Sequence, residues 1–222
     1  MEELLDKIAH CVEVGKINLK TPFPPAMKGQ PGAEELTLQA LKEGIAPAEI
    51  LTQGLIKGME KIGVKFKNNQ VFVPQVLMSA KAMGTAIKHL KPYFSDGSVA
   101  MKGQFIIGTV EGDLHDIGKN LVAMMVEGNG YEVIDLGVDV NTEKFLEAIK
   151  QHPGAYVGMS ALLTTTMTNM EQINSAIKAA YPGVVTFIGG APVTAEFAQK
   201  IGADYYTDGP QELVEILNRI SA

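Results

Sequence analysis

The sequence predicts an α + α/β protein, in which an N-terminal bundle of four helices precedes a parallel β-sheet domain. Two observations predict this fold class. In the first 94 residues, apolar side chains recur at helical spacing between proline- and glycine-rich breaks. From residue 103 onward, short apolar runs alternate with amphipathic stretches, as in strands joined by crossover helices. We therefore expect a helical-bundle cap domain at 1–94, a linker at 95–102 and an α/β domain at 103–222.

Four stretches of the first domain predict helices. The first covers 2–16 and the second 33–43, and the segment 21–32 between them is broken by prolines, which lack the backbone donor that a helix needs. Pro47 suits the first turn of the third helix, which runs to about residue 66, and Pro74 opens the fourth. The segment 21–32 is either a partner-contact loop or a spacer, and we favour a spacer.

The second domain alternates strands with helices. Strands are predicted at 104–110, 131–136, 156–160, 184–189 and 204–207, and helices at 116–128, 142–151, 165–180, 194–201 and 210–221. Strands connected in this way form a parallel sheet with right-handed crossovers and helices on both faces, a Rossmann-like or flavodoxin-like arrangement. Ligands of such sheets bind at the carboxyl ends of the strands. The loops after Val110, Ser160 and Gly189 are therefore the candidate site.

Composition and charge exclude several classes of function. The 222 residues carry a net charge of −6 and no basic run, which argues against a protein that binds nucleic acid through phosphates. A single cysteine excludes an internal disulfide or a multi-cysteine metal site. No stretch approaches the ~20 apolar residues of a membrane span, and the acidic N-terminus lacks the pattern of a secretory signal. We expect a soluble protein of the reducing cytoplasm, with no nucleic-acid or membrane partner.

The two predicted domains differ in charge. Residues 1–98 hold 12 lysines and 10 acidic residues, a balance of +2, whereas residues 99–222 carry the remaining balance of −8. The change falls at 95–98, SDGS, a small polar stretch that is typical of a linker.

The loop after the first strand, residues 111–120, reads EGDLHDIGKN and places a histidine at the mouth of the sheet. A neutral imidazole is a good ligand for a transition metal, and a carboxylate on its other nitrogen fixes the tautomer. Gly118 would let a bulky ligand lie close to the backbone. The plainer interpretation is a solvated histidine, or a helix cap formed by Asp113 or Asp116. The spacing alone names no metal.

Four motifs together resemble one family. Residues 113–118, DLHDIG, resemble the D-x-H-x-x-G signature of cobalamin-binding domains that hold the cofactor base-off with a protein histidine on cobalt. Residues 160–162, SAL, resemble the S-x-L of that family, and residues 188–191, IGGA, resemble its paired glycines. Upstream, residues 72–76, FVPQV, resemble the helical cap of methionine synthase and of the corrinoid proteins of anaerobic methyltransferase systems. The resemblance covers essentially the whole chain.

The resemblance implies a role for each residue. His115 would be the lower axial ligand of cobalt, Asp113 the partner of its other ring nitrogen, and Thr166 the hydroxyl of a proton relay. Methionine synthase has a serine where this chain has Thr166, so both the relay and a simple helix cap stay open for this residue. The remaining residues expected to contact the cofactor are Gly112, Leu114, Asp116, Ile117, Gly118, Ser160, Leu162, Thr164, Gly189, Gly190, Val73, Val76 and Leu77.

Two of these groups have a plainer explanation as well. The paired glycines would leave room for the nucleotide tail of the cofactor, but a turn after a strand also needs a glycine. Val73, Val76 and Leu77 would form an apolar lid over the reactive face of the cofactor. Apolar residues at this spacing are also typical of the core of a helical bundle.

The function that the resemblance implies is that of a methyl carrier. The protein would hold cobalamin, as methylcobalamin or a Co(I) corrinoid, and move a methyl group from a substrate-specific methyltransferase to a second methyltransferase. The acceptor would be tetrahydrofolate or coenzyme M, and the donor methanol, a methylamine, betaine or a methoxy-aromatic compound. A reductive activator would be a third partner. Such a carrier is a subunit of a methyltransferase system in one-carbon metabolism, is not expected to be catalytic alone, and would use 95–102 as a hinge.

Two other functions are weighed against the carrier. A cobalamin-dependent sensor would act through protein contacts, and a light-driven change in oligomeric state would distinguish it. A phosphate-accepting receiver domain needs an aspartate at the end of the third strand, where this chain has Ser160. Beside the bundle and the sheet, we expect no room for the ~250-residue barrel of a mutase or for a DNA-binding domain, which favours the carrier.

Overall fold

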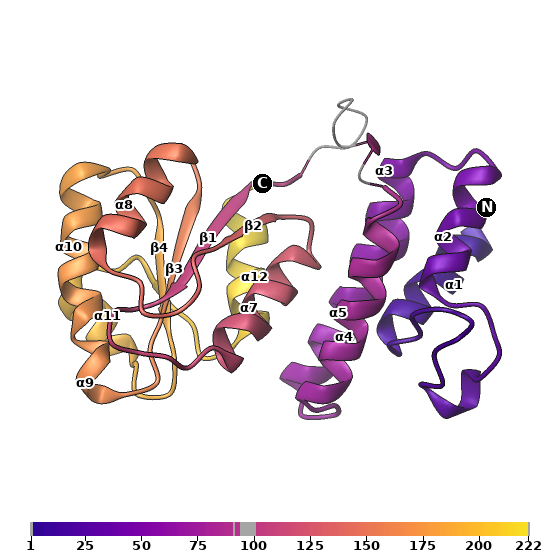
Figure 1. The fold of residues 1–222 in the computed structure, drawn as a ribbon, viewed down its shortest axis with the longest axis horizontal. Helices are drawn as coiled ribbons and strands as arrows, with labels where there is room; N and C mark the ends of the chain where they lie inside the picture. Colours follow the sequence, from indigo (N-terminus) through magenta and orange to yellow (C-terminus); the bar gives the residue numbers. More distant parts are fainter. Residues whose placement is uncertain (1, 91, 94–100, 222) are drawn as a thin grey trace. The chain divides into compact units, whose positions relative to one another are not determined.

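The chain folds into two units, which we describe from a computed structural model covering residues 2–90, 92–93 and 101–221. One unit is helical and consists of residues 1–101, to which residues 128–130 are added by their contacts; the other is built on a β-sheet and consists of residues 102–127 and 131–222. The predicted fold class, a helical bundle followed by a parallel α/β domain, is confirmed (Figure 1). Residues 95–100 of the predicted linker and hinge lie outside the described residues.

The helical unit is built around its first helix. Its elements are α1 (Glu2–Glu13), η1 (Pro25–Met27), α2 (Ala33–Lys42), α3 (Pro47–Glu49), η2 (Ile50–Ile56), α4 (Lys57–Lys67) and α5 (Val73–Ile87). Ile8 and Val12 of α1 are fully buried, because α2, η2, α4 and α5 all pack against this helix. In the described part of the chain, no helix has the length and apolar character needed to cross a membrane.

The third predicted helix, 47–66, is not one regular α-helix. Its middle, η2, is a π-helix between α3 and α4. Two glycines of this stretch pass close to α1: a Cβ on Gly58 would lie 2.5 Å from the carbonyl oxygen of Ala9, and a Cβ on Gly54 would lie 3.0 Å from a methyl carbon of Ile8. The first predicted helix is also shorter than expected, since it ends at Glu13, before Gly15 turns the chain with φ +73°.

The sheet unit is a five-stranded parallel sheet in the order β2-β1-β3-β4-β5. The strands are β1 (Gln104–Thr109), β2 (Glu132–Asp135), β3 (Tyr156–Ser160), β4 (Thr186–Gly189) and β5 (Tyr205–Tyr206). The helices are α7 (Ile117–Glu127), α8 (Thr142–Gln151), α9 (Thr164–Met167), α10 (Asn169–Ala180), α11 (Ala195–Ile201) and α12 (Pro210–Ile220). The strand order reverses between β1 and β3, which is where sheets of this type hold ligands.

Helices cover both faces of the sheet. Figure 1 shows α8, α10 and α11 on one face and α7 and α12 on the other. Small residues make room for aromatic side chains on each face: a Cβ on Gly108 would lie 2.9 Å from the ring of Phe145, and a Cβ on Gly158 would lie 2.7 Å from the ring of Phe105. On the α7 and α12 face, the rings of Phe105 and Phe187 pack 5.9 Å apart. These two rings cover the amino-terminal half of the strands on this face. They do not cover the carboxyl ends of the strands.

One prediction for this unit is wrong in detail. The predicted helix 165–180 is two helices, α9 and α10, which are separated at Thr168. Ile117, one of the predicted site residues, has a side chain that is 77% exposed. Ile117 is the first residue of α7 and lies at the end of the loop, where no strand remains to cover it.

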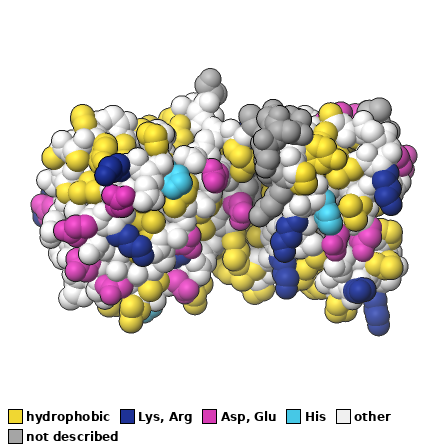
Figure 2. Space-filling view, turned by 45° about the horizontal axis from the view of Figure 1, so that its top comes forward, with side chains coloured by type: hydrophobic (Ala, Val, Ile, Leu, Met, Phe, Trp, Pro, Cys, Tyr) yellow, Lys and Arg dark blue, Asp and Glu magenta, His cyan; other side chains and the backbone are white. Residues whose placement is uncertain are grey.

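The surfaces of the two units keep the charge difference that the sequence indicates. Figure 2 shows acidic side chains spread over the sheet unit, whereas lysines are prominent on the helical unit. Some of these lysines pair with carboxylates of α1, as Lys57 does with Asp6 at 2.9 Å and Lys65 does with Glu13 at 2.7 Å.

One ion pair holds the short edge strand of the sheet. The carboxylate of Asp204 accepts hydrogen bonds from Lys178 Nζ at 2.5 Å, from Thr186 N at 2.6 Å and from Thr186 Oγ1 at 3.0 Å. Burial alone would raise the pKa of Asp204, but these hydrogen bonds outweigh it and hold the pKa below its usual range. The interaction joins α10, β4 and the start of β5.

We expect Asp204→Ala to lower the free energy of unfolding by about 1–2 kcal/mol at pH 7, because partial exposure screens the lost bonds. The folded pKa is lowered, so this contribution is complete above the ordinary value of 3.8 and is lost as the pH falls further. Urea unfolding followed by circular dichroism at pH 7 and pH 3 measures the difference. Glu143→Ala, at an exposed position, is the control. A difference from wild type that does not shrink at pH 3 would contradict this account.

Candidate functional site

The structure brings the predicted loop residues together at the carboxyl edge of the sheet. Asp113 and His115 lie in the connection from β1 to α7, Leu162 in the connection from β3 to α9, and Thr166 in α9. These segments are almost 50 residues apart in sequence, yet they meet at one carboxylate.

That carboxylate belongs to Asp113, whose side chain is fully buried. Its Oδ1 accepts from the backbone N–H of His115 at 3.0 Å and from the ring Nδ1 of His115 at 2.8 Å. Its Oδ2 accepts from Leu162 N at 2.8 Å and from the Thr166 hydroxyl at 2.6 Å. Burial alone would raise the pKa of Asp113, but these hydrogen bonds outweigh it and bring the pKa well below its usual range. Asp113 is therefore a carboxylate at neutral pH.

The state of Asp113 fixes the tautomer of His115. An ionised carboxylate can only accept, so Nδ1 of His115 carries the proton that faces Asp113. The other nitrogen, Nε2, then has a free lone pair in the neutral ring. The His115 side chain is 52% exposed, and no hydrogen bond to Nε2 comes from any residue that the structure describes. Such an outward-facing, oriented imidazole nitrogen is typical of a metal ligand.

His115 would be the sole protein ligand of a metal at this place. Among residues 2–90, 92–93 and 101–221, no group of three or more His, Cys, Asp or Glu side chains could hold a metal ion. One imidazole suits a metal whose other positions are filled by a macrocycle, as in a metal-containing cofactor.

The hydroxyl of Thr166 belongs to the Asp113 site. Thr166 is 7% exposed, and its Oγ1 lies 2.6 Å from Asp113 Oδ2 and 3.1 Å from the carbonyl oxygen of Leu163. Since a hydroxyl has one proton, the shorter contact to the carboxylate is the one it donates. Thr166 is the third residue of α9 and provides no side-chain cap, so the helix-cap interpretation is wrong and the hydrogen bond that a relay needs is present.

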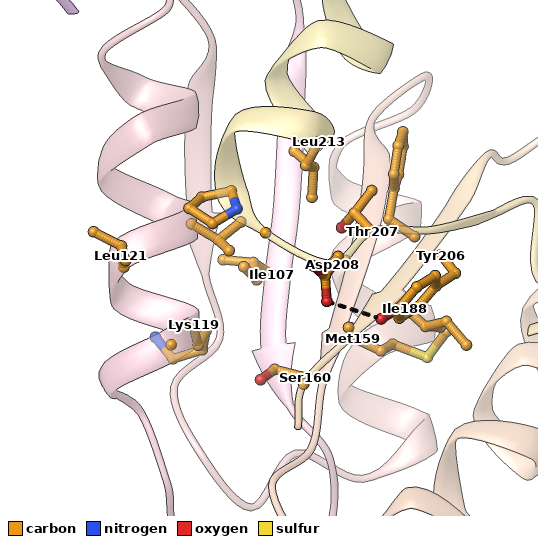
Figure 3. Close-up of a pocket in the computed structure, with 18 of the residues that line it drawn as sticks. Ile107, Lys119, Leu121, Met159, Ser160, Ile188, Tyr206, Thr207, Asp208 and Leu213 are labelled. Carbon is orange, nitrogen blue, oxygen red and sulfur yellow. Dashed lines mark hydrogen bonds between the residues drawn. The ribbon is translucent and has the colours of Figure 1, made fainter. Parts of the chain in front are cut away.

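A cavity of about 230 Å³ opens beside this loop, between the carboxyl ends of the strands and helices α7 and α12 (Figure 3). Its lining is mostly apolar, with buried Ile107 and Phe187 on the sheet side and buried Leu121 and Leu213 on the side of α7 and α12. Polar side chains gather at the end of β5, where the hydroxyl of Tyr206 donates to Asp208 at 3.2 Å. The predicted residues that line the cavity are Gly118, Ser160, Gly189 and Gly190. Leu162 and Thr164 lie outside it.

The glycines of the cavity serve different purposes. A Cβ on Gly190 would lie 1.8 Å from the carbonyl oxygen of Ala161, and a Cβ on Gly189 would lie 3.2 Å from that of Thr207. Close packing of the protein's own backbone therefore requires a glycine at position 190, whether or not a ligand is bound, and leaves little room for a side chain at position 189. A Cβ on Gly118 would meet no protein atom within 4 Å, although Gly118 lines the cavity. The absence of a side chain at Gly118 therefore leaves space in the cavity that a ligand could occupy.

Lys119 also lines the cavity, although the sequence motifs indicate no role for it. Its side chain is 2% exposed, and its ammonium group binds both oxygens of Asp135, at 2.7 and 2.6 Å, and Asn120 Oδ1 at 2.7 Å. The pairing neutralises a buried charge in the cavity wall. Its signal in the sequence was weak, because the two members of the pair lie 16 residues apart on different elements.

Exposed apolar side chains flank the site. They are Leu114 (71% exposed), Ile117 (77%), Leu162 (44%) and Leu163 (43%). Three of them lie in the two connections that meet at Asp113 and Ile117 directly follows the first connection, so they form an apolar rim on the edge that presents His115. Large apolar groups left in contact with water are typical of a binding surface. Asp116 lies in the same stretch, and its carboxylate accepts from the side-chain amide of Asn120 at 2.9 Å.

The three predicted lid residues lie on α5 of the helical unit. Val76 is fully buried, Val73 is half-buried and Leu77 is 38% exposed. Val76 is thus a core residue of the structure, as the plainer interpretation holds, whereas Leu77 has exposed surface and its place in a lid stays a prediction.

The chain is similar in sequence to characterised corrinoid proteins. Models of the B12 binding domain match residues 103–217 and residues 30–91. The trimethylamine corrinoid protein of Methanosarcina barkeri is 43% identical over 186 residues, which cover 82% of this chain and 86% of that protein. Dimethylamine corrinoid protein 1 of Methanosarcina acetivorans is 39% identical over 216 residues, which cover 96% and 95% of the two chains.

Solved structures agree with these sequence matches. A chain of the methanol:cobalamin methyltransferase complex MtaBC from Methanosarcina barkeri matches with a TM-score of 0.83 at 28% identity, over 99% of this chain and 80% of that one. A cobalamin-binding protein from Desulfitobacterium hafniense DCB-2 matches with a TM-score of 0.75 at 27% identity, over 97% of both chains.

The Thr166 hydroxyl can be tested without any ligand. We expect Thr166→Val, which keeps the shape of the side chain, to lower the free energy of unfolding by about 1–3 kcal/mol, because a buried carboxylate loses a donor. Thr166→Ser retains the donor and is expected to cost less than about 1 kcal/mol. Urea unfolding of the ligand-free protein, followed by circular dichroism, compares the two. Equal stability of the valine and serine variants would remove Thr166 from the Asp113 site.

Proposed function

Since the chain belongs to the B12-binding corrinoid proteins and its cofactor is cobalamin, we propose that it holds cobalamin base-off through His115 and carries a methyl group between two methyltransferases. The resemblance seen in residues 113–118 is thus confirmed at the level of the family and its cofactor. The observation that carries the proposal for the site is the geometry of His115, whose Nδ1 is fixed by Asp113 while Nε2 faces outward.

The residues at this edge fit cobalamin in three respects. A lone imidazole nitrogen can serve a metal that is otherwise held by a macrocycle. The apolar rim of Leu114, Ile117, Leu162 and Leu163 offers a surface for a large flat ring. The cavity of about 230 Å³ lies beside it, and Gly118 leaves part of it free of protein atoms, so it can take a nucleotide tail.

When bound, cobalamin supplies the cobalt atom on which the methyl group is carried. His115 would hold the cobalt through Nε2, and Asp113 would orient the ring. While His115 is neutral, Nδ1–H donates to Asp113, so the lone pair on Nε2 would be available to the metal. In a ring that is not bound to the metal, Nε2 would be open to a proton instead, with Nδ1–H still facing Asp113. The proton on Nε2 and ligation by Nε2 therefore exclude each other.

Thr166 completes the chain of groups behind His115. Its hydroxyl donates to Asp113 Oδ2 at 2.6 Å, on the oxygen that does not face the ring. This hydrogen bond stabilises the negative charge of Asp113, which in turn sets how strongly the carboxylate polarises His115. We assign to Thr166 the role that a serine has in methionine synthase, since the hydroxyl reaches the carboxylate despite the additional methyl group.

The relatives suggest the partners. Proteins named for trimethylamine and dimethylamine, and a chain from a methanol methyltransferase complex, match most of this chain. We place its methyl donor among methylated amines and alcohols, each delivered by a substrate-specific methyltransferase. A second methyltransferase, with tetrahydrofolate or coenzyme M as acceptor, and a reductive activator complete the proposed system. The carrier is not catalytic alone, and we place it in the cytoplasm.

Replacing the proposed ligand tests the site directly. We expect His115→Ala to bind cob(II)alamin ~10–100-fold more weakly and to lose the nitrogen splitting that the ligand imposes on the electron paramagnetic resonance spectrum of cobalt. His152→Ala, which removes a histidine at the far end of α8, is the control and should retain both properties. A His115→Ala protein whose absorbance and resonance spectra match those of wild type would show that His115 is not the ligand.

Filling the cavity tests where the nucleotide tail lies. We expect Gly118→Leu to fold normally, because the new side chain meets no protein atom near its Cβ and a helix loses ~0.5–1 kcal/mol by having glycine instead of alanine. Binding of cobalamin should fall by ~10-fold or more, as measured by the cofactor retained after gel filtration. Gly183→Leu, at a turn with equally open surroundings before β4, is the control. Full retention by Gly118→Leu would place the tail elsewhere.

A further inference from the structure

We propose that Asp139 is a positioning residue, which holds the loop that carries Asp113 and His115 in the conformation needed for ligation. The inference rests on the proposed function, because it assigns the loop to the cobalt ligand. Asp139 lies in the connection from β2 to α8, outside the motif that contains His115. It touches neither the ring of His115 nor the carboxylate of Asp113 in the described structure, so it would act through the backbone of the loop.

Asp139 binds two consecutive residues of that loop. Its Oδ1 accepts from the backbone N–H of Gly112 at 2.7 Å. Its own backbone N–H donates to the carbonyl oxygen of Asp113 at 3.0 Å. One residue thus holds the peptide between Glu111 and Gly112, which precedes Asp113, and the peptide that follows Asp113.

The backbone of Asp139 is in the left-handed region, with φ +53°. Outside the helical unit, it is the only non-glycine residue with positive φ in the described part of the chain. This conformation is unfavourable for residues with a Cβ, although aspartate and asparagine tolerate it better than most. Backbone strain of this kind persists where the surroundings require it and clusters at functional sites. Here it turns both the N–H and the carboxylate of one residue toward the same loop.

Two other residues, Asn169 and Thr109, also hold the loop that carries Asp113 and His115, but at different positions from Asp139. The side-chain amide of Asn169, at the start of α10, donates to the carbonyl oxygen of Glu111 at 2.7 Å. At the other end, the hydroxyl of Thr109 donates to the carbonyl oxygen of His115 at 2.9 Å. Asn169 and Thr109 therefore hold the two ends of the loop, and Asp139 holds its middle. Without Asp139, the backbone of Gly112 would lose its bond in the described structure.

Three substitutions separate the carboxylate from the backbone conformation. Asp139→Asn keeps an oxygen acceptor and tolerates positive φ. Asp139→Gly accepts the conformation at no steric cost but removes the acceptor. Asp139→Ala removes the acceptor and disfavours the conformation. Glu143→Gln, which changes one exposed charge four residues away, is the matched control.

Two measurements are made on each protein. In the ligand-free protein, hydrogen exchange of the Gly112 amide reports whether the loop is held. In the protein loaded with cob(II)alamin at one fixed pH, the nitrogen splitting of the resonance spectrum reports the ratio of histidine-ligated to unligated cobalt. We expect Asp139→Gly to speed the exchange and to lower this ratio by ~10-fold or more, the size typical of residues that orient a metal ligand. Asp139→Asn should stay within ~3-fold of wild type, and Glu143→Gln should be unchanged.

The outcomes separate the two proposals. If wild type shows no histidine ligation, the proposed function fails, whatever the exchange experiment gives. If wild type is ligated and Asp139→Gly has the wild-type ratio, the assignment of Asp139 is overturned, even if exchange is faster. If Asp139→Ala and Asp139→Gly do not fold, Asp139→Glu provides the second test, because it keeps the charge but moves the acceptor by one methylene group. Faster exchange of the Gly112 amide together with a wild-type ratio in Asp139→Glu would overturn the assignment of Asp139.

Discussion

The buried carboxylate of Asp113 is the interaction on which the site depends. A charge with no exposed surface is tolerated only where donors surround it, because an unpaired buried charge is very costly. Here the donors come from its own loop, from the β3–α9 connection and from α9. Folding of two distant segments of the chain around one carboxylate therefore also determines the tautomer of His115. The hydrogen bonds to Asp113 therefore both stabilise this edge of the sheet and determine which nitrogen of His115 carries the proton.

The cavity follows from how the sheet is covered. Aromatic rings such as Phe105 and Phe187 fill the amino-terminal half of one face, while small residues lie toward the carboxyl ends. Gly190 and Gly118 show that a glycine in a motif has more than one explanation. The first is required because the chain after β4 passes against Ala161, and this would hold in a protein that binds nothing. The second has no such neighbour, so Gly118 is the more informative of the two about a ligand.

The sequence predicted what depends on local periodicity and on the order of strands and helices. It placed the loops after Val110, Ser160 and Gly189 at one edge, since parallel strands share that edge. It missed the π-helix η2, because the spacing of its apolar residues also fits an α-helix. It did not show that Ile117 is exposed, because periodicity does not show where a strand stops covering a helix. Asp139 and Lys119 were missed because their roles come from partners on other elements, which only the folded chain brings together.

Under the proposed function, the same arrangement would let His115 leave the metal while the site stays intact. Only one of the bonds to Asp113 involves the imidazole ring; the others come from backbone N–H groups and from Thr166. The carbonyl oxygen of His115 is held separately, by the hydroxyl of Thr109. Rotation or protonation of the ring therefore leaves the carboxylate satisfied and the loop backbone in place. A ligand that must bind and release repeatedly needs this separation, because a loop that unfolded at each release would add its ordering entropy to each return.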